Sequence, residues 1–123
     1  IAICTLSPIG EYPDSAINQH IGKFNDFIKK TAEEKDIPVL DVSGSMWDEL
    51  SKRTYPVNKN YNPKMAVIAK DMYGACIQHY IFKKPWDRVG ESRRQWLLFD
   101  QIHLGERGAR VMFNLAKGYI SKN

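Results

Sequence analysis

The first third of the chain alternates between apolar runs and one amphipathic segment. Residues 1–6 form a continuous apolar run that ends at a Ser-Pro pair, which is typical of a strand buried on both faces of a parallel sheet. A helix capped by Asp14 or Ser15 is predicted next. Its expected buried stripe is Ile17, Ile21, Phe24, Ile28 and Ala32. A second apolar run over residues 37–42 predicts another strand, so this region predicts a right-handed parallel crossover.

The middle of the chain is less regular and is predicted to consist of helices joined by loops. The expected elements are a loop over residues 43–45, a short helix over 46–53, an exposed loop over 55–63, a helix over 64–82 and a loop over 83–94. The apolar positions of the long helix are Met65, Ile68, Met72, Cys76 and Tyr80.

An apolar run over residues 97–99 leads into Asp100 and His103, and a last helix is predicted from Glu106 onward. The expected buried stripe of that helix is Ala109, Met112, Phe113, Ala116 and Ile120. The short spacing lets the carboxylate of Asp100 reach the imidazole of His103. A carboxylate that orients a histidine and stabilises its protonated form is two-thirds of a nucleophilic hydrolase site. An aspartate that caps the last helix, with a histidine packed nearby, explains the spacing equally well.

Two predicted strands are too few to form a complete sheet with both faces and both edges covered. The chain also opens on Ile1, at the first residue of a strand that needs neighbours. We therefore expect the chain to be part of a larger sheet, with residues upstream that were cleaved, lie on another chain or are omitted.

Composition narrows the class of protein. The 123 residues form at most one domain, and with 43% hydrophobic and 26% charged residues they are typical of a globular protein without a transmembrane helix. The net charge of +4 is spread over scattered lysines and arginines, which favours a solvated basic surface over a nucleic-acid site. Cys4 and Cys76 are predicted to be buried free thiols, which favours a reducing compartment such as the cytoplasm without identifying the location.

Functional crevices of parallel sheets lie beyond the carboxyl ends of the strands. Residues 7–11, 41–45 and 100–103 should meet there. Asp41 is a rival orienting acid, although capping of its own loop is the favoured interpretation. His20 and His79 are interpreted as surface histidines, because no spacing of His, Asp and Glu indicates a metal site.

The chain resembles the SGNH (GDSL-type) esterase and lipase family at both ends. The stretch DQIHL from Asp100, followed by ERGA and an amphipathic helix, looks like the last conserved block of that family. The opening strand, the stretch SPIGE, the first helix and the strand IPVLDV resemble the segment that follows the third block. Residues 52–94 show little likeness. The resemblance implies that residues 1–123 are the C-terminal part of a flavodoxin-like α/β/α three-layer sandwich with a parallel sheet.

The resemblance also implies an ester hydrolase that works by Ser-His-Asp acyl transfer on a small-molecule ester, without a cofactor or metal. Asp100 would orient the imidazole, and His103 would act as general base and then general acid. The blocks of the family that carry the serine, the glycine and the asparagine of the site are not present, and Gly105 stands where relatives often have asparagine. The nucleophile is therefore expected on an N-terminal half of the domain, either upstream or on a second chain.

Serines of this chain are weaker candidates for the nucleophile. Ser45 follows a predicted strand but lacks the Gly-x-Ser-x-Gly elbow, and Ser7 precedes a proline that removes an oxyanion donor. Aromatic residues that could wall an acyl pocket, although packing is the favoured interpretation, are Tyr80, Phe82, Trp86 and Trp96. The competing hypothesis is a non-catalytic fragment or degenerate relative that binds a partner through its open sheet edge. Binding of nucleic acid ranks last.

Overall fold

The computed structural model describes residues 1–56, 58–59 and 61–121, and this part contains both helices and strands, as expected. In chain order the elements are β1 (Ile3–Cys4), α1 (Ala16–Glu34), β2 (Val39–Leu40), α2 (Val42–Ser51), α3 (Met65–Cys76), the π-helical segment η1 (Ile77–Ile81), α4 (Trp86–Glu91) and α5 (Glu106–Ile120). Val57 and Asn60, which fall in the loop expected over residues 55–63, lie outside the described residues.

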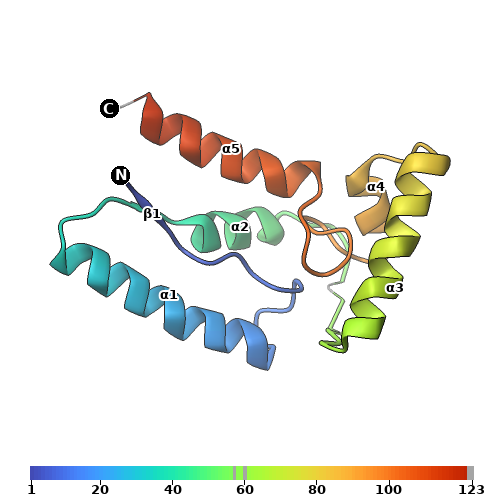
Figure 1. Ribbon diagram of the computed structural model, residues 1–123, viewed down its shortest axis with the longest axis horizontal. Coiled ribbons are helices and arrows are strands. Elements are labelled where there is room, and N and C mark those ends of the chain that lie inside the picture. Colours follow the sequence, from blue (N-terminus) through green and yellow to red (C-terminus); the bar gives the residue numbers. More distant parts are fainter. Residues whose placement is uncertain (57, 60, 122–123) are drawn as a thin grey trace.

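The two strands pair in parallel, with Ile3 opposite Val39 and Cys4 opposite Leu40. The backbone N–H groups of Ile3 and Thr5 donate to the carbonyl oxygens of Pro38 and Leu40, at 2.9 and 3.1 Å. Helix α1 connects the strands, so the expected strand–helix–strand unit is confirmed. Figure 1 shows that β1 runs between α1 and α5.

Strand β1 is far more exposed than its apolar sequence predicts. Ile3 is 37% and Leu6 is 46% exposed, and Cys4 is exposed as well, so burial on both faces is wrong for the described part of the chain. The reason is that β2 pairs with one edge of β1, and no other described strand pairs with the opposite edge. The two cysteines are free, and Cys76 is half-buried.

Helix α1 begins after Ser15, whose side chain accepts a hydrogen bond from the N–H of Asn18, so one of the two expected caps is confirmed. The predicted buried stripe is wrong in part, because Phe24 is 59% exposed. The buried residues of this helix are Asn18, Ile21, Asn25 and Ala32.

Two asparagines explain why the buried face of α1 differs from the predicted apolar stripe. The side-chain amide of Asn25 accepts from the N–H of Leu6 and donates to its carbonyl, at 2.7 and 3.0 Å. Asn18 binds the backbone of Ile9 in the same way, with both distances 3.0 Å. These bonds satisfy backbone groups that would otherwise be buried without partners. A polar contact thus fixes which side of α1 faces the chain after β1.

Helix α2 begins at Val42 rather than at residue 46, and the loop expected over residues 43–45 is its first turn. The change follows from Asp41, whose Oδ1 accepts from the N–H of Gly44 at 3.1 Å and caps the helix. This helix supplies much of the core, whose buried members are Val42, Met46, Leu50, Leu97 and Leu98.

Helix α5 begins at Glu106 as predicted, but its predicted buried stripe is wrong. Met112, Phe113 and Ile120 are 38%, 63% and 72% exposed. The helix instead packs Val111 and Leu115 against the core, next to the buried Gly108. A Cβ at Gly108 would lie 2.8 Å from the carbonyl oxygen of Leu97, so only glycine allows this close approach.

Residues 64–94 agree with prediction in one part and differ in another. The helix expected over residues 64–82 is present, as α3 followed directly by the π-helical segment η1. The loop expected over residues 83–94 contains α4, which starts after Pro85. The carboxylate of Glu106 caps α4 by accepting from the N–H groups of Trp86 and Asp87, at 2.9 and 2.6 Å. Among the described helices, none is long and apolar enough to cross a membrane.

Candidate active site

Residues 97–105 form a tight loop on the core. Leu98 and Leu104 make an isolated antiparallel bridge, and the N–H of Gly105 donates to the carbonyl of Leu97 at 2.6 Å. Within the loop, the N–H of Phe99 donates to the carbonyl of His103 at 3.0 Å. Because Leu97 and Leu98 are buried in the core, the loop starts from a rigid base.

Asp100 and His103 are brought together as the sequence predicts. The carboxylate of Asp100 is fully buried, and its Oδ2 lies 2.7 Å from Nδ1 of His103. Its other oxygen, Oδ1, accepts from the N–H groups of Ile102 and His103, at 3.2 and 2.8 Å. A carboxylate is an acceptor only, so Nδ1 carries the proton, and in the neutral imidazole Nε2 then has a lone pair. The side chain of His103 is 53% exposed, and no hydrogen bond to its Nε2 is found among the described residues.

Asp100 does not cap the last helix, which the sequence left as the alternative explanation. The N-cap position of α5 is Gly105, and Oδ1 of Asp87 accepts from the N–H of Arg107 at 3.0 Å instead. A Cβ at Gly105 would lie 2.6 Å from that carboxylate oxygen. The glycine found here therefore makes room for an aspartate from α4 to cap α5.

Gln101, at the apex of the loop, ties it to distant parts of the chain. Its φ of +77° is unusual for a residue other than glycine, and its side chain is buried. The side-chain Nε2 of Gln101 donates to the carboxylate of Asp71 at 2.9 Å. The backbone carbonyl of Gln101 accepts from the N–H of Gly10 at 2.7 Å. Such bonds compensate for a strained backbone and hold the neighbouring Asp100 and His103 in place.

Glu11 is a buried residue next to the candidate site, and the sequence does not single it out. Its carboxylate is 2% exposed and accepts three backbone hydrogen bonds, from the N–H groups of Trp96, Leu97 and Leu98, at 2.6, 2.6 and 2.9 Å. Burial raises the pKa of Glu11, while these N–H groups and Arg53 act in the opposite direction. Its donors are Trp96, just before the loop over residues 97–105, and the first two residues of that loop. The one sign of Glu11 in the sequence is that it is a single charged residue shortly after the apolar run over residues 1–6.

Four rings form a stack that ends at His103. The ring of His79 lies 3.9 Å from that of Trp86, Trp86 lies 4.2 Å from Phe99, and Phe99 lies 5.8 Å from His103. The interplanar angles between successive rings are 14°, 26° and 18°, so each ring is roughly parallel to the next. Stacking on Phe99 restricts rotation of the imidazole, and the bond to Asp100 restricts it further.

The remaining sequence candidates lie elsewhere. Asp41 caps α2 and binds Lys29 at 2.8 Å, and in the described part of the chain no imidazole is hydrogen-bonded to it. Ser45 lies in the first turn of α2, and within the described residues neither Ser45 nor Ser7 is hydrogen-bonded to His103. Trp96 packs against the core under Arg107, and Phe82 is 66% exposed. No described hydroxyl or thiol bonds Nε2 of His103.

A metal site is not apparent either, because the described residues contain no group of three His, Cys, Asp or Glu side chains that could hold an ion. A comparison of the chain with family models, with curated proteins and with solved structures finds no match. The function of the site must therefore be inferred from its geometry and from the resemblance of its residues.

Proposed function

We propose that this chain supplies the general base and the orienting acid of a serine-type ester hydrolase of the SGNH kind. The observation that carries the proposal is the 2.7 Å contact between the buried Asp100 carboxylate and Nδ1 of His103, with the imidazole half-exposed. This arrangement fixes the tautomer, leaves Nε2 free and places a negative charge where an imidazolium would form.

The proposed reaction is acyl transfer in two steps. Nε2 of His103 takes the proton of an attacking serine hydroxyl as that oxygen bonds to the ester carbonyl, and Asp100 stabilises the resulting imidazolium. The imidazolium returns the proton to the alkoxide leaving group when the ester bond breaks. Water then attacks the acyl-enzyme, with His103 again taking the proton, and the acid is released as the serine regains its hydrogen. The substrate is a small-molecule ester.

The serine and the oxyanion donors are proposed to come from a further polypeptide segment beside β1. The N–H groups of Ile3 and Thr5 face β2, whereas the peptide groups of Cys4 have no hydrogen-bond partner among the described residues. Figure 1 shows α1 and α5 on either side of β1. Exposed apolar side chains lie on or just after β1 and on these two helices, namely Ile3, Leu6, Phe24, Phe27, Met112 and Phe113. An open edge with apolar flanks is suited to the addition of another strand. This segment would complete the three-layer sandwich that the resemblance implies.

The proposal is tested in the full-length protein with a fluorophosphonate probe and an ester substrate. His103→Ala should lower kcat/KM by about 10³-fold or more and abolish labelling of a serine, without changing the thermal unfolding temperature appreciably. The matched control is His79→Ala, because that ring lies at the far end of the stack and its Nδ1 bonds the carbonyl of Lys84. Activity retained in His103→Ala would refute the proposal.

A binding module is the second candidate, and the exposed apolar edge of β1 favours it. The two hypotheses differ in one observable. A folded full-length protein that no fluorophosphonate labels and that hydrolyses no ester, but that binds a partner through β1, would support the module. Labelling that depends on His103 would support the hydrolase.

A further inference from the structure

Large apolar side chains are exposed at successive positions of residues 77–84, a segment that we call the tip. Tyr80, Ile81 and Phe82 are 62%, 68% and 66% exposed, and Ile77, one turn earlier, is 48% exposed. These residues belong to η1 or end it, and π-helical turns are frequent at functional sites. Neighbouring exposed side chains of this size indicate a surface that binds a partner.

The backbone of the tip is held in place although its large side chains are exposed. The N–H of Lys84 donates to the carbonyl of Gln78 at 3.1 Å, and Nδ1 of His79 bonds the carbonyl of Lys84 at 2.8 Å. The ring of His79 stacks on Trp86 of α4. His79 thus anchors the tip to the rest of the fold, and the three residues that follow it remain exposed on an ordered turn.

Two lysines follow the apolar residues directly. Lys83 and Lys84 are exposed, and neither forms an ion pair within the described residues. Residues 72–86 contain no aspartate or glutamate. The acids on either side of this stretch, Asp71 and Asp87, accept hydrogen bonds from other parts of the chain. The positive charge of the tip is therefore not neutralised by a neighbour along the chain, which favours an anionic partner.

The tip lies apart from the open edge of β1. Figure 1 shows α3 and α4, which flank the tip in the sequence, at the opposite end of the molecule from β1. A segment added beside β1 therefore does not need to cover the tip. The two exposed apolar surfaces can serve different partners.

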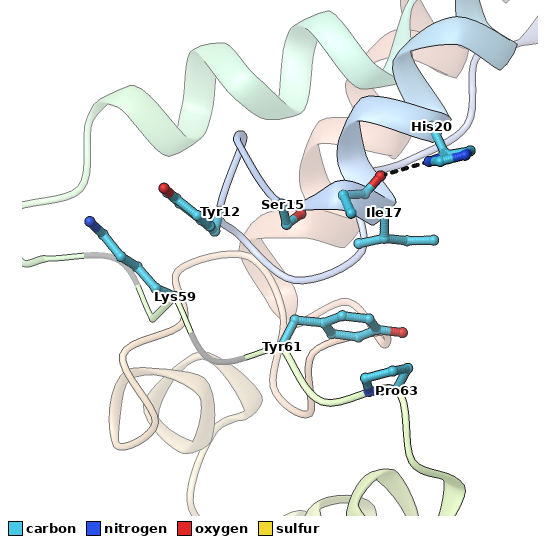
Figure 2. A pocket seen from close by; sticks show the side chains of 8 residues that line it. Tyr12, Ser15, Ile17, His20, Lys59, Tyr61 and Pro63 are labelled. Atoms are coloured by element: carbon cyan, nitrogen blue, oxygen red, sulfur yellow. Dashed lines mark hydrogen bonds between the residues drawn. The ribbon is translucent and has the colours of Figure 1, made fainter.

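The hollow beside the first turns of α1 does not combine apolar surface and charge in this way. Figure 2 shows its cation, Lys59, beside Tyr12 and at the far end from Ile17 and His20. An apolar group that filled the hollow near Ile17 would therefore not reach the charge. In the tip, by contrast, the two lysines adjoin the apolar residues.

We propose that the tip docks on an anionic lipid surface, with Tyr80, Ile81 and Phe82 among the head groups and Lys83 and Lys84 at lipid anions. Aromatic and aliphatic side chains beside lysines are typical of proteins that lie on a membrane without crossing it, and tyrosine favours the head-group region. Lysine is suited to such a surface because its compact charge needs no fixed geometry of the anion. The inference stands without ester hydrolysis, since it uses neither member of the catalytic pair that we propose.

The test measures co-sedimentation of the full-length protein with two kinds of vesicle, phosphatidylcholine alone and equal parts of phosphatidylcholine and phosphatidylserine. Partitioning onto the mixed vesicles should be about tenfold stronger or more, because two lysines meet anionic lipid. Added salt should weaken this preference. Lys83→Gln/Lys84→Gln should remove it. Ile81→Ser/Phe82→Ser should lower partitioning onto the mixed vesicles by about tenfold or more, because the inserted apolar surface is lost.

Two matched variants are the controls. Met65→Ser replaces an exposed apolar residue at the other end of α3, and Lys30→Gln/Lys117→Gln removes the same charge from α1 and α5. Both should partition as the unmodified protein does. The proposal would be overturned if the unmodified protein bound neither kind of vesicle or bound both equally. A preference for the mixed vesicles that survives Lys83→Gln/Lys84→Gln would overturn it as well.

A further protein segment packed on the tip is the rival occupant, and thermal unfolding of the full-length protein distinguishes it. If the tip is exposed for a membrane, Ile81→Ser/Phe82→Ser should leave the unfolding temperature nearly unchanged, because exposed positions contribute little to stability. A clear fall in that temperature would show that protein covers the tip, and would overturn the proposal. Because His103→Ala should not alter partitioning, failure here and failure of the hydrolase proposal are separate results.

Discussion

Asp41 and Asp100 make similar turns in two regions of the chain, and only Asp100 holds an imidazole. In each turn, Oδ1 of the aspartate accepts a hydrogen bond from the backbone N–H three residues later. The donor is Gly44 for Asp41, at 3.1 Å, and His103 for Asp100, at 2.8 Å. The difference lies in the other oxygen and in burial. Oδ2 of Asp41 binds Lys29, and the side chain of Asp41 is 42% exposed. Oδ2 of Asp100 binds Nδ1 of His103, and the side chain of Asp100 is fully buried.

The comparison shows that a loop aspartate is not by itself an orienting acid. Both turns satisfy backbone donors, which is the ordinary role of an aspartate before a helix or within a tight turn. A buried carboxylate bonded to an imidazole stabilises a proton on that ring more strongly than an exposed carboxylate does, because water weakens the interaction of exposed charges.

Asp100→Asn should have the largest effect on activity. The amide places a donor where Nδ1 needs an acceptor, so the wrong tautomer is favoured, and we expect kcat for ester hydrolysis to fall by about 10³- to 10⁴-fold. The matched variant Asp41→Asn keeps a good N-cap and should change kcat by less than about threefold. Both are measured in the full-length protein with unfolding curves as a check on folding. Equal losses in the two variants would remove the distinction drawn between the aspartates.

The contact between Asp100 and His103 and the helices α1 and α5 were predictable from the sequence because they depend on local spacing, whereas α4 was missed. Asp100 can reach His103 across three positions, and the last helix starts at Glu106 as its pattern indicates. The buried faces were not predictable, because they depend on contacts made far along the chain. Asn25 of α1 is buried through its bonds to Leu6, and Gly108 of α5 is buried by close approach to Leu97.

Glu11 shows most clearly why the rest of the site was missed. Its three partners lie 85 to 87 positions further along the chain, so no local pattern connects them. A glutamate is almost never buried unless it is paired, and the sequence alone gives no sign of which backbone donors would pair with it. The same is true of Gln101, whose side chain reaches Asp71 across 30 positions.

Glu11→Ala should have the next largest effect, on stability rather than chemistry. The change leaves three backbone N–H groups at Trp96, Leu97 and Leu98 without their acceptor, and the free energy of unfolding should fall by about 3 kcal/mol. Glu11→Gln keeps one acceptor oxygen and should cost less. Denaturant unfolding measures both, with Glu33→Ala on the exposed side of α1 as the control. An unchanged free energy in Glu11→Ala would mean that the loop over residues 97–105 does not depend on this carboxylate.

Lys29→Met should have the smallest effect, and its pH dependence tests the role of Asp41. Burial tends to raise the pKa of Asp41, but the bonds from Lys29, the Gly44 N–H and Thr5 hold it below the ordinary value of 3.8. A carboxyl group with a lowered pKa stabilises the fold above its unfolded pKa, and that contribution is lost as the pH falls through the folded value. Both side chains are nearly half-exposed, so the pair is worth only about 0.5 kcal/mol at pH 7.

We therefore expect Lys29→Met to be less stable than the unmodified protein at pH 7, and the difference to shrink as Asp41 becomes protonated below pH 4. Urea unfolding at pH 7 and at pH 3 measures the difference, and Lys30→Met, which changes the adjacent exposed lysine, is the control. A difference that is the same at both pH values would show that Lys29 acts through the packing of its methylene groups. In that case the contrast between Asp41 and Asp100 would rest on burial and on the imidazole, and not on the charge that each carboxylate faces.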